Sequence, residues 1–231
     1  MSNYILLIES TTTVCSVALV KEDEVIFEKS VNEGYSHSEN LACFVQQAFS
    51  ESDILVSDLS AVAVSQGPGS YTGLRIGTSL AKGICTALNI PLIACDTLMS
   101  LTFHPIISEM VKETSAYLLP MIDARRMEVY TAIFDEQRNI VSPVEPHVVT
   151  EESFLHLKNK PVLLFGNGAN KLKSVEFHNS NIQIIENIEL NARFMLFEAT
   201  EKFKTKTFED TAYFEPFYLK SFQATKPKKR L

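Results

Sequence analysis

A unit of strand, carboxylate, turn and second strand occurs twice in this sequence, and that repetition limits the possible folds more than any other feature. The first copy runs from Leu6 to Glu9 and the second from Pro120 to Asp123, in the other half of the chain. Each is a short apolar run typical of a buried strand, and each ends in an acid. Chance similarity of two hairpins is one reading. The other is a tandem duplication, which predicts an α/β fold of two lobes with one hairpin each facing a cleft.

The remaining pattern agrees with two lobes. Short apolar or alternating runs predict strands over 4–8, 14–20, 25–31, 59–64, 92–95, 117–122, 128–134 and 162–165. Apolar residues spaced as on one helical face predict helices over 41–49 and 190–203, the latter burying Phe194, Phe197 and Ala199. A proline-free stretch after a glycine-rich turn predicts a third helix over 72–88. We therefore expect an N-terminal lobe over 1–100 and a smaller C-terminal lobe over 101–231.

Charge and cysteine usage exclude several classes of protein. A formal charge of -7 argues against a protein that grips nucleic acid over its whole surface. The basic tail from Lys226 to Arg230 reads more simply as a solvated chain end than as a phosphate contact. No apolar run reaches the roughly 18–20 residues that cross a bilayer. The sequence favours a cytoplasmic protein without a membrane segment, and its cysteines, Cys15, Cys43, Cys85 and Cys95, show no ligand spacing.

The two hairpin turns hold the first set of possible site residues. In an actin-like phosphotransferase, such turns hold phosphates and a strand-end acid positions a metal-bound water. The first turn, Glu9-Ser10-Thr11, keeps small hydroxyl residues but has Glu where Asp is favoured. The second, from Asp123 to Arg125 and Arg126, lacks glycine. Each acid could instead cap its own strand.

A glycine-rich segment from Gly67 to Gly77 is the most specific motif. It matches neither the P-loop nor the dinucleotide fingerprint nor the nucleophile elbow. It predicts a tight turn at Gly67, Gly69 and Ser70 that opens a helix, whose free N–H groups and Arg75 could bind an anion. Gly73, Gly77 and Ala81 then form a smooth strip on that helix, which could pack against the 41–49 helix or against a partner.

His37 opens the preceding helix, and a metal-binding relative would carry a second histidine one turn later. That position is Leu41, so no metal site is expected.

With these residues in view, the chain resembles the TsaB (YeaZ) family. The similarity rests on Leu7 to Thr11, His37 to Leu41, the Gly67 to Gly77 motif and Asp123 to Tyr130. It implies the actin-like ASKHA fold and a place in the machinery that makes threonylcarbamoyladenosine at position 37 of ANN-decoding tRNAs.

The resemblance also implies a division of labour. The chain would be a non-catalytic subunit that binds and activates the transferase TsaD, joined by the ATPase TsaE, with ATP and metal held by those partners and tRNA reached through the complex. A homodimer could form without TsaD. The expected docking residues are His37, Leu41, Phe44, Val45, Thr72, Gly73, Leu74, Gly77, Thr78 and Ala81. The alternatives are an actin-like ATPase or small-molecule kinase that uses Glu9 and Asp123, and a metallopeptidase.

Overall fold

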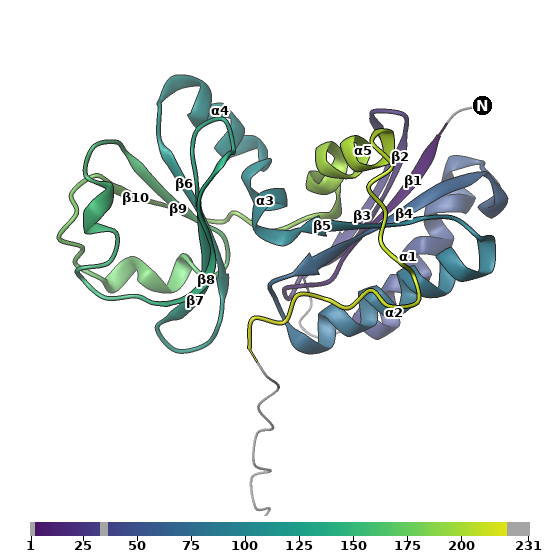
Figure 1. Ribbon diagram of the computed structural model, residues 1–231, viewed down its shortest axis with the longest axis horizontal. Helices are drawn as coiled ribbons and strands as arrows, with labels where there is room; N and C mark the ends of the chain where they lie inside the picture. Colours follow the sequence, from purple (N-terminus) through teal and green to yellow (C-terminus); the bar gives the residue numbers. More distant parts are fainter. Residues whose placement is uncertain (1–2, 33–36, 221–231) are drawn as a thin grey trace, which may run out of the picture.

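Two lobes lie side by side in the computed structural model, which describes residues 3–32 and 37–220 (Figure 1). Each lobe is built on a five-stranded mixed sheet. The strand order is β3-β2-β1-β4-β5 in the first sheet and β10-β9-β6-β7-β8 in the second. Read from β8, the second order is β8-β7-β6-β9-β10, so the two sheets have the same topology. The duplicated two-lobed α/β fold predicted from the sequence is confirmed.

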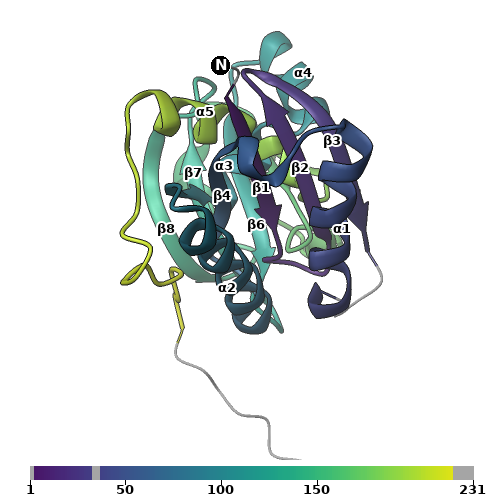
Figure 2. The same cartoon turned by 90° about the vertical axis from the view of Figure 1, so that its right-hand side faces the viewer.

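The first sheet comprises β1 (Tyr4–Glu9), β2 (Cys15–Lys21), β3 (Glu24–Val31), β4 (Leu59–Gly67) and β5 (Leu92–Asp96). β1 pairs antiparallel with β2 and parallel with β4. The helices α1 (His37–Ser52) and α2 (Tyr71–Leu88) cover one face of this sheet, as Figures 1 and 2 show. Because side chains alternate along a strand, Leu6 and Ile8 pack beneath these helices while Ile5 and Leu7 face the other side.

The second sheet comprises β6 (Tyr117–Asp123), β7 (Glu128–Phe134), β8 (Ile140–Val148), β9 (Val162–Phe165) and β10 (Ile182–Ile185). α3 (Thr97–Thr102) and α4 (Pro105–Glu113) connect the sheets. Leu98, Leu101 and Ile107 from this connection pack into the core of the second lobe. The connection between the lobes therefore belongs to the core of the second lobe from about Leu98.

The end of the chain corrects the expected second lobe. The 3-10 turn at Ala192–Met195 and α5 (Leu196–Lys204) pack back on the first sheet, where Met195 and Ala199 cover Ile5 and Leu7. The expected C-terminal lobe over 101–231 is therefore wrong from about residue 192, because the free face of the first sheet needed a cover. The helix expected over 190–203 begins only at Leu196. Phe197 is 60% exposed rather than buried, and it lies against the ring of Phe103.

Residues 207–220, here called the C-terminal strap, run along the edge of the first lobe (Figure 1). Glu209 N–H donates to the carbonyl of Leu92 at 2.9 Å, and Phe217 N–H donates to that of Gln66 at 2.7 Å. Lys82 of α2 donates to the carbonyls of Ala212 and Phe214. The strap thus shields edge strand β5 and one side of α2.

Among the helices in residues 3–32 and 37–220, none is long and apolar enough to cross a bilayer.

Candidate functional site at the hairpin turns

The acid of the first hairpin is sealed inside the molecule. Glu9 is 0% exposed, and Thr11 N–H donates to its carboxyl at 2.6 Å while the hydroxyls of Thr11 and Ser65 donate to its two oxygens. Burial raises the pKa of Glu9, and the hydrogen bonds from Ser65 and Thr11 partly oppose that rise. The assignment of Glu9 to an open cleft is therefore wrong, because protein donors already occupy both oxygens.

The first hairpin turn and the glycine-rich turn lie against each other. Ser70 N–H donates to the carbonyl of Thr11 at 2.7 Å, and the hydroxyl of Ser10 donates to the carbonyl of Gly73 at 2.9 Å. A Cβ at Gly69 would overlap with Thr11, so the two turns touch through their backbones. The contact leaves Gly67 buried and Gly69 half-buried.

Ser70 caps the start of α2 from within the chain. Ser70 is its N-cap, and the Ser70 hydroxyl accepts from Gly73 N–H at 3.3 Å. Arg75 is exposed, but its guanidinium lies 5.5 Å from the ring of Tyr71, on the side of the C-terminal strap. The anion site expected from Ser70 and Arg75 is therefore not assembled around the first hairpin.

The acid of the second hairpin is exposed but neutralised. Asp123 forms an ion pair with Lys171 and accepts from Arg125 N–H at 3.0 Å. Its own N–H donates to the side-chain oxygen of Asn167. Lys171 also donates to the carbonyl of Glu128 at 2.6 Å, which fixes the lysine over the turn. A lysine and a backbone N–H thus both bind Oδ1 of Asp123.

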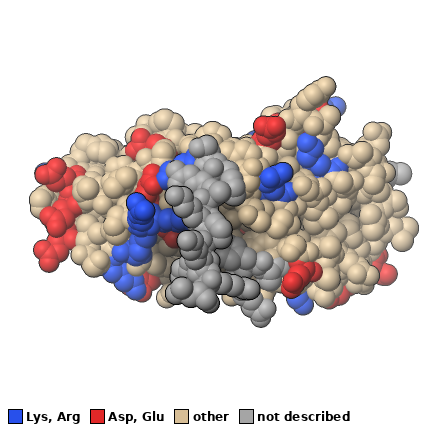
Figure 3. All heavy atoms as spheres, turned by 90° about the horizontal axis from the view of Figure 1, so that it is seen from below, with Lys and Arg blue, Asp and Glu red and all other residues tan. Residues whose placement is uncertain are grey.

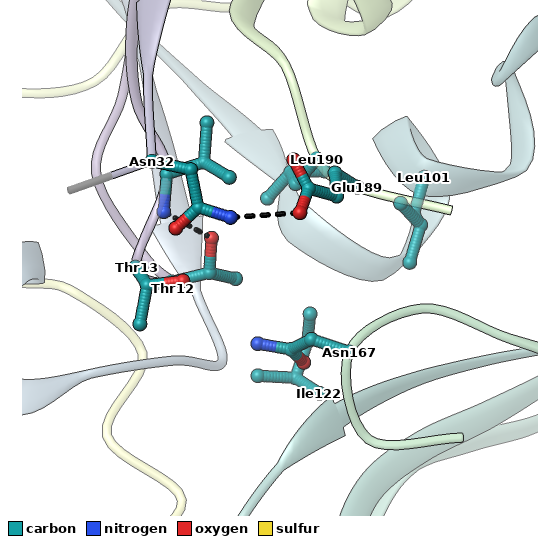
Figure 4. Close-up of a pocket in the computed structure, with 9 residues that line it drawn as sticks. Thr12, Thr13, Asn32, Leu101, Ile122, Asn167, Glu189 and Leu190 are labelled. Atoms are coloured by element: carbon teal, nitrogen blue, oxygen red, sulfur yellow. Dashed lines mark hydrogen bonds between the residues drawn. The ribbon is translucent and has the colours of Figure 1, made fainter. Parts of the chain in front are cut away.

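A small cavity lies between the lobes. A cavity of about 20 Å³ separates Thr12, Thr13 and Asn32 of the first lobe from Ile122 and Asn167 of the second (Figure 4). Asn32 donates to Glu189 at 2.7 Å and closes one side. That volume holds roughly one water molecule, whereas small-molecule sites measure about 300–1,000 Å³. None of the residues expected to form a nucleotide-like cleft lines this cavity.

Most of the expected docking residues are buried inside the chain instead of exposed on its surface. Thr72 is exposed and Val45 is half-buried, as a docking surface requires. The other eight are buried inside the chain: His37, Leu41, Phe44, Gly73, Leu74, Gly77, Thr78 and Ala81. The physical reason is the glycine strip, which lets α2 approach the first hairpin so closely that a Cβ at Gly73 or Gly77 would overlap with Ser10.

His37 contacts the backbone of the first hairpin turn. Its ring Nε2 lies 2.8 Å from the carbonyl oxygen of Thr12, and the side chain is 2% exposed. Within the described residues, no group of three or more His, Cys, Asp or Glu side chains is placed to hold a metal ion.

Three residues that matter at the turns were missed from the sequence: Ser65, Asn167 and Lys171. Ser65 lies just beyond the predicted 59–64 strand, and its partner Glu9 is 56 residues away. Lys171 follows a Gly-Asn-Gly turn, which signals tight backbone packing but does not say which acid the lysine meets. Such long-range pairs leave no periodic signal in a single sequence.

Comparison with known proteins places the chain among tRNA-modification proteins. A family described as "TsaD: tRNA N6-adenosine threonylcarbamoyltransferase" matches residues 33–225. The tRNA threonylcarbamoyladenosine biosynthesis protein TsaB of Bacillus subtilis is 32% identical over 166 residues, which span 70% of this chain and 70% of that protein. The TsaB protein of Escherichia coli is 34% identical over 58% of this chain and 56% of its own length.

A solved structure extends the similarity to the whole fold. YeaZ from Pseudomonas aeruginosa superposes with a TM-score of 0.71 over 94% of this chain and 99% of its own, at 21% sequence identity. At that identity the likeness concerns the fold.

Proposed function

The chain belongs to the tRNA N6-adenosine threonylcarbamoyltransferase family and, within it, to the TsaB (YeaZ) group, so it takes part in threonylcarbamoyladenosine modification of tRNA. From this premise we propose that it is a non-catalytic subunit that binds and activates TsaD. The ATPase TsaE joins the complex, and ATP and metal are held by the partner subunits. The complex works in the cytoplasm, and without TsaD two copies of the chain pair through the same face.

The state of the two hairpin acids is the observation that carries the non-catalytic role. Glu9 is buried and accepts hydrogen bonds at both oxygens, and Asp123 is paired with Lys171. A phosphotransfer site needs carboxylates that reach a metal in an open cleft. This geometry disfavours the rival reading, an ATPase or small-molecule kinase that uses Glu9 and Asp123.

The surface that we assign to TsaD is the outer side of α2, here called the outer helix face. Positions 72, 76, 79 and 83 follow the helical repeat and lie opposite the buried glycine strip. Thr72, Ser79 and Gly83 are exposed, Ile76 is half-buried, and none of the four is charged. Small uncharged residues allow a second helix to approach closely. Val45 of the neighbouring α1 adds a half-buried apolar side chain.

The size of residue 83 tests this assignment. A Cβ at Gly83 meets no atom within 4 Å, so the fold has room for a larger side chain. We expect Gly83→Trp to abolish capture of TsaD because the indole would hold the partner helix away. The measurement is co-purification of TsaD with the tagged full chain.

Gly83→Ala is the matched control, since it keeps a small residue, and it should capture TsaD as the wild type does. Capture of TsaD by the folded tryptophan variant at the wild-type level would show that the outer helix face is not the docking surface.

A further inference from the structure

The turn between β6 and β7 carries two arginines in an unfavourable backbone conformation. Arg125 has φ 72° and Arg126 has φ 49°, a region that non-glycine residues seldom adopt. Both side chains are exposed. Asparagine or glycine would fit this backbone at lower free-energy cost. Strain kept at an exposed turn suggests that the arginine side chains serve a purpose other than folding.

Charge around this turn is not balanced. Asp123 is paired with Lys171, and Glu128 is paired with Lys220 of the C-terminal strap. Among the described residues, Arg125 and Arg126 have no ion-pair partner. Two arginines and two lysines therefore lie near two acids, Asp123 and Glu128. This region is locally positive on a chain whose formal charge is -7. We call Arg125, Arg126, Lys171 and Lys220 the basic hairpin face.

Aromatic rings adjoin this face where the strap crosses between the lobes. The ring of Tyr218, two residues before Lys220, lies 4.9 Å from that of Tyr71, and Lys220 Nζ lies 5.8 Å from the ring of Tyr130. Tyr218 is also near Arg75 and the acid Glu215. Seen from below, Lys and Arg gather on the second lobe beside the start of the grey chain end (Figure 3). Through Lys220, the strap thus brings Tyr218 to the edge of the basic hairpin face.

We propose that the basic hairpin face binds the phosphodiester backbone of tRNA, an inference that rests on the proposed function. Two exposed guanidinium groups can each bind a phosphate through paired N–H donors. Tyr218, two residues before Lys220, is exposed and offers a ring on which an unpaired base can stack. Because the rest of the chain is acidic, RNA is confined to this face. The basic tail from Lys226 to Arg230 lies outside the described residues and is not part of this face.

The test compares the full-length wild type with Arg125→Asn/Arg126→Gly, which removes both charges and suits the backbone. The probe is an unmodified tRNA transcript, and binding is followed by fluorescence anisotropy over a series of salt concentrations. We expect affinity to fall about tenfold at low salt and the slope of log K against log salt to flatten by about two, one for each lost phosphate contact. The thermal midpoint of the variant should not fall.

A matched variant, Lys21→Gln/Lys112→Gln, removes two exposed cations outside the basic hairpin face and should bind tRNA like the wild type. Equal binding by the wild type and the arginine variant, or no binding of tRNA by the wild type, would overturn the proposal. So would capture of the wild type by phosphatidylserine vesicles in preference to tRNA. The arginine variant should still co-purify with TsaD, so a failure of this proposal is distinguishable from a failure of the docking assignment.

Discussion

Replacing Gly73 by alanine is expected to lower the free energy of unfolding by about 3 kcal/mol. The added methyl group would overlap with the backbone carbonyl of Ser10, which cannot move aside without disturbing the turn that encloses Glu9. For a chain of this size, the thermal midpoint should fall by roughly 6–12 °C. Thermal and urea unfolding of the purified variant would measure both quantities.

Gly83→Ala makes the same chemical change ten residues later on the same helix, where no atom lies within 4 Å. It should be neutral or stabilise by up to about 1 kcal/mol, because alanine favours helix more than glycine does. Equal stability of the two variants would contradict the inward packing of the glycine strip. The same packing means that a bulky residue at Gly77 reports on folding, so it cannot serve as a test of docking.

Glu9→Ala is expected to cost about 3–5 kcal/mol of stability. It removes the acceptor of Thr11 and Ser65, leaves their donors buried without partners, and opens a void. Glu9→Gln keeps the shape and an acceptor oxygen and should cost much less. Urea unfolding at neutral pH measures the difference between the two variants. Equal losses would show that shape and hydrogen bonding at Glu9 do not stabilise the turn.

The pH dependence of the glutamine variant follows from the raised pKa of Glu9. Folding favours the protonated carboxyl, so the contribution of Glu9 is full below its unfolded pKa of ~4.3 and is lost as pH rises through the higher folded pKa. Glutamine is neutral at every pH. The stability of Glu9→Gln relative to the wild type should therefore increase from pH 4 upward, which thermal unfolding across this range would show.

The sequence predicted the strands and the two lobes because burial on one or both faces leaves a periodic pattern. β1 and β6 were recognisable as apolar runs that end in an acid, and the identical strand orders confirm the duplication. Membership of the TsaB group was likewise recognisable from the Gly67 to Gly77 motif.

The direction of the glycine strip could not be predicted, because a smooth helix face looks the same whether it meets its own chain or a partner. The partners of the two acids could not be predicted either, because they lie far away in the sequence. Lys171 pairs with Asp123 across 48 residues, and Ser65 bonds to Glu9 across 56. The packing of the 192–195 turn and α5 on the first lobe was missed for a similar reason. Ala192 and Met195 are apolar, and their sequence does not indicate which of the two cores they join. Such pairings depend on tertiary packing, which local patterns do not encode.

The claim that this chain supports a catalyst, rather than acting as one, is tested most directly by the rate of tRNA threonylcarbamoylation with TsaD and TsaE. Asp123→Asn removes the charge of the exposed hairpin acid but keeps an acceptor for Arg125 N–H. We predict that this variant supports modification within about twofold of the wild type, since no acid–base step is assigned to it. A loss of about a hundredfold or more, with capture of TsaD intact, would contradict the account.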